Sequence, residues 1–201
     1  MIAIVNYGLG NLGSIENMLK RMGIPAYIAN TPADLGKATK IILPGVGAFD
    51  TGMRHLKNHA WIDPLSERVM IKKMPVLGIC LGMQLMTHAS EEGVEPGLGW
   101  VDAVTIKFPS SVGRVPHMGW NVAHIAKDSR LLTDEGIENR FYFVHSYFVK
   151  LNKSSDELLN TVYSVPFTSG FETNNILGVQ FHPEKSHRFG MKLLSNFATR
   201  Y

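Results

Sequence analysis

The sequence predicts an α/β fold with three layers: a mostly parallel central sheet flanked by helices, with a smaller antiparallel part in the second half. In the first half, short apolar runs alternate with helical patterns, which is the order of β-α-β units in parallel sheets. In the second half, apolar runs are joined by turns, as in antiparallel pairs. The 201 residues contain no internal repeat or linker, so we expect one domain over residues 1–201.

The individual elements follow from local patterns. Gly23 ends the first helix and Pro44-Gly45 ends the second strand, because glycine and proline interrupt regular structure. In the first half we expect strands at Ile2–Val5, Lys40–Leu43 and Pro75–Ile79, and helices at Ile15–Met22, Thr51–Asn58, Ile62–Lys73 and Leu81–Ala89. In the second half we expect strands at Val101–Ile106, Gly119–Ile125, Phe141–Val149, Leu158–Val165 and Ile176–Phe181, then a helix over Lys185–Phe197.

Composition and charge argue against several classes of function. Hydrophobic residues make up 45% and charged residues 18% of the chain, an ordinary globular balance. The net charge of +3 comes from scattered Lys and Arg, so we expect no nucleic-acid binding. No apolar run approaches the roughly 20 residues that span a bilayer, and the N-terminus does not resemble a signal peptide. With Cys80 as the single cysteine, a reducing compartment fits, and we expect a cytoplasmic protein without membrane association.

The strongest local signal is the segment Gly78-Ile79-Cys80-Leu81-Gly82. It has the form of a nucleophile elbow with Cys in place of Ser, between a predicted strand and a predicted helix. A thiol at a helix N-terminus is favoured as the thiolate. The backbone N–H of Leu81 has no helical partner, so it can bind the oxyanion of an attacked carbonyl. A lone Cys after an apolar strand is more often a small core residue, but the two glycines favour the elbow.

A candidate base follows the last predicted strand, in Gln180-Phe181-His182-Pro183-Glu184. Residues two apart in extended chain face the same side, so Glu184 is expected to accept a hydrogen bond from His182 and orient it toward Cys80. Six other histidines lack such a context and are interpreted as surface or interface residues: His55, His59, His88, His117, His124 and His187. The His and Cys spacing does not suit a metal site, and the glycines of residues 8–13 are wrongly spaced for a dinucleotide. We therefore expect no metal and no cofactor.

These motifs carry a resemblance that spans the whole chain. The elbow and the His-Pro-Glu segment resemble those of class I glutamine amidotransferases of the Cys-His-Glu triad type. Further segments resemble the family of glutaminase subunits of imidazole glycerol phosphate synthase. They are Asn6-Tyr7-Gly8, Leu43-Pro44-Gly45-Val46-Gly47, Gly97-Leu98-Gly99-Trp100, Pro116-His117-Met118-Gly119-Trp120-Asn121 and Phe143-Val144-His145-Ser146-Tyr147.

The resemblance implies a fold of the amidotransferase type and roles for named residues. Cys80 would attack the carboxamide of L-glutamine, with His182 moving protons and Glu184 orienting it. The second oxyanion donor would come from Val46 or Gly47. The glutamine pocket would include Gln84, one helical turn after Cys80, together with His145, Ser146 and Tyr147.

The resemblance also implies a partner, a (β/α)8-barrel cyclase that receives the ammonia in histidine biosynthesis. Asn11, Trp120, Tyr142 and Lys185 would lie on the docking face, although both aromatic residues are also compatible with a core position. Two alternatives stay open. The chain would be a glutaminase subunit serving pyridoxal phosphate, anthranilate or carbamoyl phosphate synthesis, or a non-catalytic α/β relative that acts as a binding module or chaperone.

Overall fold

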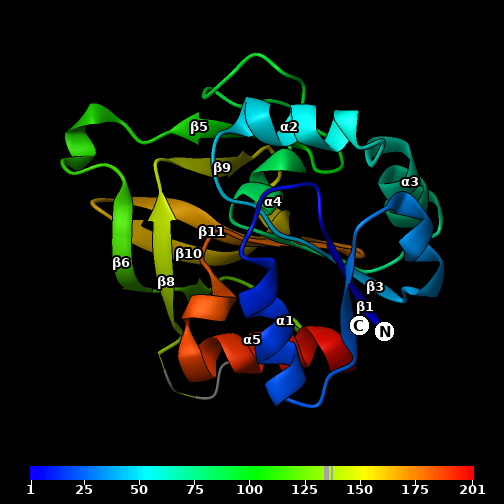
Figure 1. Ribbon diagram of the computed structural model, residues 1–201. Coiled ribbons are helices and arrows are strands. Elements are labelled where there is room, and N and C mark those ends of the chain that lie inside the picture. The colour runs from blue at the N-terminus through cyan, green and yellow to red at the C-terminus, as the bar shows by residue number, and fades with distance from the viewer. Residues whose placement is uncertain (134–135, 137) are drawn as a thin grey trace.

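The computed structural model describes residues 1–133, 136 and 138–201 and has a central sheet with helices on both faces (Figure 1). The strand order along the sheet is β2-β1-β3-β4-β12-β11-β10-β7, and β9 and β5 extend it from β11. The pairs from β2 to β12 are parallel, and the pairs beyond β12 are antiparallel. The predicted fold class is confirmed.

The first half of the chain supplies the parallel strands β1, β2, β3 and β4, of which β2 was not predicted. Its four residues form an edge strand that is only half-buried, so the apolar signal is weak. The predicted helix after Cys80 is correct in position but ends four residues earlier than expected. The elements are β1 (Ile2–Val5), α1 (Leu12–Arg21), β2 (Ala26–Ala29), β3 (Lys40–Leu43), α2 (Phe49–Asn58), α3 (Ile62–Ser66), β4 (Val76–Ile79) and α4 (Leu81–Leu85).

The second half differs more from the sequence prediction. The expected strand Phe141–Val149 is two strands that separate at Ser146, because β8 pairs with β6 in a separate ribbon while β9 pairs with β5 and β11. The nine-residue strand β11 was missed. The elements are β5 (Ala103–Lys107), β6 (His117–Val122), β7 (His124–Ile125), β8 (Arg140–His145), β9 (Tyr147–Leu151), β10 (Glu157–Tyr163), β11 (Val165–Thr173), β12 (Ile176–Val179) and α5 (His187–Arg200).

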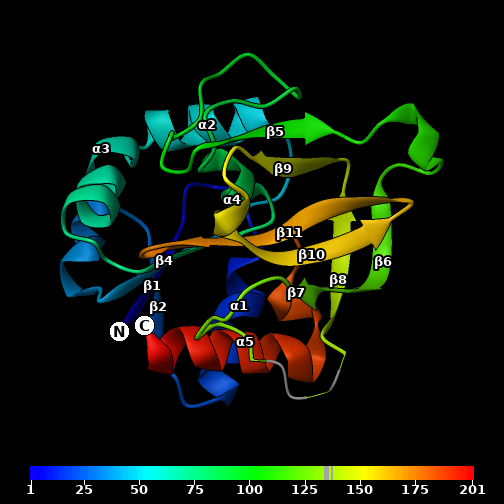
Figure 2. The same cartoon turned by 180° about the vertical axis from the view of Figure 1, so that it is seen from behind.

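Alternating side chains of β1 supply two cores, one on each face of the sheet. Ile2 and Ile4 pack with α1 and α5 on one face, and Ala3 and Val5 pack with α2, α3 and α4 on the other. Figure 2 shows α5 running beneath the sheet and α2 above it, which completes the three layers. In the part of the chain that the structure describes, no helix is both long and apolar enough to cross a membrane.

The topology brings one set of loops to the carboxyl edge of the parallel strands. The chain leaves β1, β3, β4 and β12 at this edge, and β12 lies directly beside β4 with Val179 opposite Ile79. The residues that follow these two strands, Cys80 and His182, therefore come to the same edge. Ligand sites of parallel sheets lie at this edge.

Candidate active site

Cys80 occupies the sharp turn between β4 and α4. Its backbone has φ +55° and ψ −111°, a region that residues other than glycine rarely adopt and that marks functional sites when it occurs. The surrounding sheet holds this conformation, since the Cys80 N–H donates to the Val179 carbonyl at 2.8 Å. The turn presents the side chain at the edge of the sheet, as the elbow motif predicted.

The two glycines of the elbow are required by close backbone approach. A Cβ at Gly82 would fall on the carbonyl oxygen of Leu43, and a Cβ at Gly78 would lie 2.8 Å from the Cα of Met83. A side chain at either position would push the start of α4 away from β3 or β4. The spacing Gly-x-Cys-x-Gly is therefore a packing requirement of this turn.

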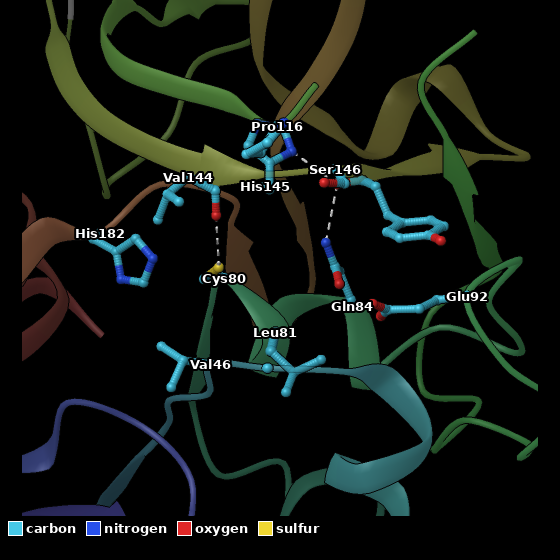
Figure 3. Close-up of a pocket in the computed structure, with 12 residues that line it drawn as sticks. Val46, Cys80, Leu81, Gln84, Glu92, Pro116, Val144, His145, Ser146 and His182 are labelled. Atoms are coloured by element: carbon cyan, nitrogen blue, oxygen red, sulfur yellow. Dashed lines mark hydrogen bonds between the residues drawn. The ribbon is translucent and has the colours of Figure 1, made fainter. Parts of the chain in front are cut away.

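The imidazole of His182 lies beside the Cys80 thiol. Its Nδ1 is 2.9 Å from Oε1 of Glu184, and the two side chains are 2% and 1% exposed. Its Nε2 is buried without a hydrogen-bond partner among the described residues, and Figure 3 shows the ring pointing toward Cys80. Burial alone lowers the pKa of His182, but interactions with Cys80 and Glu184 outweigh burial and raise the pKa above its usual value.

Glu184 reaches His182 by a different route from the one that the sequence suggested. The segment Pro183–Lys185 is a short 3-10 turn and not extended chain. The backbone N–H of His182 donates to the Tyr142 carbonyl at 2.9 Å, and the Ser186 hydroxyl donates to the His182 carbonyl at 2.6 Å. These contacts fix both ends of the turn, so that the carboxylate folds back onto the imidazole.

A cavity of about 280 Å³ opens over the thiol (Figure 3), at the small end of the range for small-molecule sites. Cys80 is 7% exposed and has a second neighbour, the Val144 carbonyl, which accepts from the thiol at 4.0 Å. The cavity contains all three predicted sets: the thiol and imidazole, the oxyanion candidates and the substrate candidates. Its lining is Val46, Gly47, Cys80, Leu81, Gln84, Glu92, Pro116, Val144, His145, Ser146, Tyr147 and His182.

The loop after β3 forms one wall of this cavity. Val46 is exposed, and Gly47 has φ +106°. The phenol of Tyr7, a residue for which the sequence predicted no role of its own, donates to the Pro44 carbonyl at 2.7 Å and anchors the start of the loop. Burial, and next the charge of Cys80, raise the pKa of Tyr7, so the phenol keeps its proton and remains a donor.

Gln84 lines the cavity from α4, one turn after Cys80, and both hydrogens of its amide nitrogen are already used. Nε2 donates to the Tyr147 carbonyl at 3.1 Å and to Oε1 of Gln180 at 3.0 Å. Only the amide oxygen remains for a ligand, so Gln84 can accept a hydrogen bond from a substrate but cannot donate one. Gln180 in turn donates to the sulfur of Cys80 at 3.7 Å.

Two residues of the site were missed from the sequence. Gln180 is fully buried between Gln84 and Cys80, and its place directly after β12, two residues before His182, was the available signal. Glu92 lines the cavity with a carboxylate that points toward Gln84 (Figure 3). It also accepts from the Phe49 N–H at 2.9 Å, a contact across 43 residues that local patterns cannot reveal.

The interpretation of His117 as a surface or interface residue is wrong. It is 2% exposed and its Nδ1 lies 3.0 Å from Nε2 of His145, because the register of the β6–β8 ribbon places the two histidines opposite each other. Burial lowers the pKa of His117 to about 4 and, as the largest cause, that of His145 to about 3. Both rings are therefore neutral at physiological pH.

These lowered pKa values predict how stability depends on pH. The unfolded chain protonates both histidines below the usual pKa of 6.5, whereas the folded chain does so only near 4 and 3. The free energy of unfolding should therefore fall as pH drops from 6.5 toward 4. We expect urea midpoints between pH 7 and 4.5 to show a shallower decline in His117→Phe than in the parent. The exposed His124→Gln serves as control, and equal slopes in all three proteins would contradict the assignment.

Three of the four predicted interface residues form one aromatic cluster. The ammonium of Lys185 lies 5.7 Å from the centroid of the Tyr142 ring, and the Trp120 ring meets Tyr142 edge-on at 6.4 Å. Trp120 is 41% exposed and stacks on His187 at 5.6 Å, so neither aromatic residue is enclosed in a core. Asn11 comes from a different element, the start of α1, which packs against the turn that carries Lys185.

Within residues 1–133, 136 and 138–201, no three His, Cys, Asp or Glu side chains gather as metal ligands. The chemistry that the arrangement can perform is nucleophilic. A thiol with an adjacent, carboxylate-oriented imidazole is the pattern of an activated cysteine. Free N–H groups at the start of α4 suit a negatively charged intermediate.

The fold and this site together define a class of protein. Residues 3–201 match the family model described as glutamine amidotransferase class-I, so the chain belongs to the class-I glutamine amidotransferases. It is 53% identical to imidazole glycerol phosphate synthase subunit HisH 2 of Methanococcus maripaludis, over 98% of each chain. It is 48% identical to HisH 2 of Pseudomonas aeruginosa, again over 98% of each. Within the class, the chain belongs to the family of these HisH subunits.

Solved structures support the fold. A crystal structure of a glutamine amidotransferase matches with a TM-score of 0.73 at 20% identity, covering 98% of this chain and 97% of the other. PurLQS from Thermotoga maritima matches with a TM-score of 0.76 at 17% identity, covering 98% and 96%. The class-I amidotransferase fold is therefore present over the length of the chain.

Proposed function

We propose that this chain is the glutaminase subunit of an imidazole glycerol phosphate synthase, acting as one catalytic domain over residues 1–201. The observation that carries the proposal is the buried Nε2 of His182, left without a partner among the described residues beside the Cys80 thiol. A buried polar atom without a partner is costly in a structural role. Such an atom is expected in an active site, where the nitrogen accepts a proton from the nucleophile during the reaction.

In the first half of the proposed reaction, Nε2 of His182 takes the thiol proton and the sulfur attacks the carboxamide carbon of glutamine. The oxygen of the tetrahedral intermediate becomes negative and is stabilised by the N–H of Leu81 and an N–H of the Val46-Gly47 loop. The imidazolium then protonates the amide nitrogen, the C–N bond breaks and ammonia leaves. A glutamyl thioester on Cys80 remains.

In the second half, a water molecule gives a proton to His182 and adds to the thioester carbon. The same N–H groups stabilise the second oxyanion, the C–S bond breaks to release glutamate, and the imidazolium of His182 returns its proton to the departing sulfur. Throughout, the Glu184 carboxylate at 2.9 Å keeps the proton on Nδ1, so that Nε2 remains free to exchange protons.

Substrate recognition is proposed at the wall that Gln84 and Glu92 form beside the elbow. The amide oxygen of Gln84 and the carboxylate of Glu92 are acceptors that suit the α-ammonium of an amino acid. His145, Ser146 and Tyr147 line the remaining side of the cavity. The dimensions of the cavity fit one small ligand, in agreement with a single glutamine.

The partner is proposed to be a (β/α)8-barrel cyclase that docks over Trp120, Tyr142, Lys185 and Asn11. Partly exposed aromatic rings with a cation beside them are typical of interface cores. Direct transfer suits ammonia, which would otherwise be protonated in water and lost. The lone free thiol must stay reduced to act, and we therefore propose that the complex works in the cytoplasm.

The proposal is tested by measuring glutamate release by the chain alone and with the cyclase. We expect the cyclase with its ribotide ligand to raise the rate by about tenfold or more, a normal size for coupling between two sites. Partners from pyridoxal phosphate, anthranilate and carbamoyl phosphate synthesis are the controls, and stimulation by one of these would redirect the assignment. If no partner elicits glutamate release and a glutamine-like diazo-ketone does not label Cys80, the chain is a binding module.

A further inference from the structure

We propose that His117 and Asn121 are positioning residues for the glutamine pocket, because they fix the tautomer and orientation of His145 and through it the backbone of residues 145–147. This inference rests on the proposed function. Neither residue lines the cavity, so both act through His145.

The hydrogen on His145 is assigned by its acceptor. Nδ1 of His145 lies 2.8 Å from the Tyr147 carbonyl. A carbonyl oxygen only accepts, so Nδ1 carries the hydrogen and Nε2 of the neutral ring is an acceptor. The other tautomer would set two lone pairs against each other at this contact. The orientation of the Tyr147 carbonyl therefore depends on which nitrogen of His145 is protonated.

His117 enforces that choice. Its Nδ1 lies 3.0 Å from Nε2 of His145, and with Nε2 an acceptor, Nδ1 of His117 must donate. Nε2 of His117 is then an acceptor as well, and Nδ2 of Asn121 donates to it at 3.2 Å. Asn121 is itself oriented, since Nδ2 also donates to the Val162 carbonyl at 2.9 Å and Oδ1 accepts from the Val122 N–H at 2.8 Å.

The hydrogen bonds from Asn121 through His117 and His145 to the Tyr147 carbonyl form a relay, and packing around its rings leaves it little freedom to rearrange. The His117 ring is stacked between Phe143, at 4.7 Å between centroids, and Tyr163, at 4.1 Å. It is directly opposite His145 in the β6–β8 register. Burial keeps both imidazoles neutral, as their lowered pKa values indicate, and only a neutral ring has the single donor and single acceptor that the relay uses.

The relay ends on the substrate and nucleophile side of the site. The Tyr147 carbonyl accepts from His145 and also from Gln84. Gln84 donates its second hydrogen to Gln180, which donates to the sulfur of Cys80. If Nε2 of His145 carried the hydrogen in place of Nδ1, the Tyr147 carbonyl would lose its donor and move. Because the same carbonyl accepts from Gln84, the orientation of Gln84 would change as well. The consequence falls on glutamine binding, because the thiol and imidazole are held by other contacts.

Two replacements of His117 separate the hydrogen bond from the packing. His117→Asn keeps an N–H donor near the place of Nδ1 but loses the stacked ring, whereas His117→Phe keeps the stacked ring but loses the donor. In the complex with the cyclase, we expect His117→Phe to raise the KM for glutamine about tenfold, as for one unmet buried hydrogen bond, with kcat within about threefold. We expect His117→Asn to stay within about threefold of the parent in KM.

A chemical readout accompanies the kinetics. Labelling of Cys80 by the diazo-ketone analogue should slow about tenfold in His117→Phe, while alkylation by iodoacetamide, which needs no glutamine pocket, stays unchanged. If His117→Phe does not unfold cooperatively in urea, Asn121→Leu tests the same relay at an edge strand. It should raise KM with unchanged kcat and iodoacetamide rate.

The outcomes discriminate between this inference and the proposed function. A larger KM effect in His117→Asn than in His117→Phe would mean that the ring only packs, and would overturn the inference. So would an unchanged KM in a folded His117→Phe or in Asn121→Leu. If glutamine fails to protect Cys80 of the parent chain from the diazo-ketone, the proposed function itself falls, and this inference with it.

Discussion

Replacing Cys80 by alanine should reduce glutamine hydrolysis by the complex by at least about 10⁴-fold, as expected when the nucleophile of a catalytic triad is removed. No other described side chain can take over, since Cys80 is the single cysteine and occupies the one position at the elbow that reaches His182. The measurement is glutamate release at saturating glutamine, with detection sensitive enough to follow a loss of four decades.

Synthesis from added ammonium salts by the same Cys80→Ala complex is the control. It should continue at the rate of the parent complex, because ammonia is all that the proposed cyclase partner would receive from this chain. Loss of both activities would show that Cys80 supports the fold or the interface, in line with the alternative that a buried Cys is a core residue. The Met83→Leu variant, one turn along α4 and fully buried, is a matched change that leaves the site chemistry intact.

Glu184→Gln should lower kcat by about 10²- to 10⁴-fold with a small change in KM, as loss of the orienting carboxylate does in other triads. The side chain keeps its size, but the buried negative charge 2.9 Å from Nδ1 of His182 is removed. Because that charge helps to raise the pKa of His182, the variant should hold the imidazolium less well. Alkylation of Cys80 by iodoacetamide near neutral pH should slow in parallel.

The matched control for this change is Glu92→Gln, which removes a carboxylate from the same cavity on the substrate side. It should raise KM for glutamine and leave the iodoacetamide reaction unchanged, since Glu92 has no contact with His182 in the described structure. If Glu184→Gln retained kcat within about tenfold of the parent, the carboxylate would have only a structural role.

The parallel half of the fold was predictable because its signals are local. The runs Ile2–Val5, Lys40–Leu43 and Val76–Ile79 are apolar on both faces, as buried parallel strands are. The second half was predictable only in part, because the limits and the number of its strands depend on partners far along the chain. Phe141–Val149 reads as one apolar run, and only pairing of β8 with β6 and of β9 with β5 divides it. The strand β11 was missed because it contains Pro166 and a polar Thr-Ser-Gly stretch, and proline and glycine are infrequent in strands.

The residues of the candidate site were likewise predictable where their signals are local and not where they depend on distant contacts. The elbow glycines and the His-Pro-Glu segment are short-range patterns, and the structure brings Cys80, His182 and Glu184 together as expected. The residues that support them act at long range. Gln180, Glu92 and His117 are defined by contacts across 43 to 100 positions or by cross-strand register, which no spacing in the sequence expresses.

The position of β12 between β4 and β11 has a consequence for the newly made protein. The nucleophile follows β4, which is made in the first half of the chain, whereas the base follows β12, which lies within the last 26 residues and must insert into the middle of the sheet. A chain interrupted before Ile176 would leave the edge of β4 unpaired by β12 and would lack His182, the proposed base. Until β12 and the turn that carries His182 and Glu184 are made, a copy of the chain lacks both the base and the orienting carboxylate of the proposed triad.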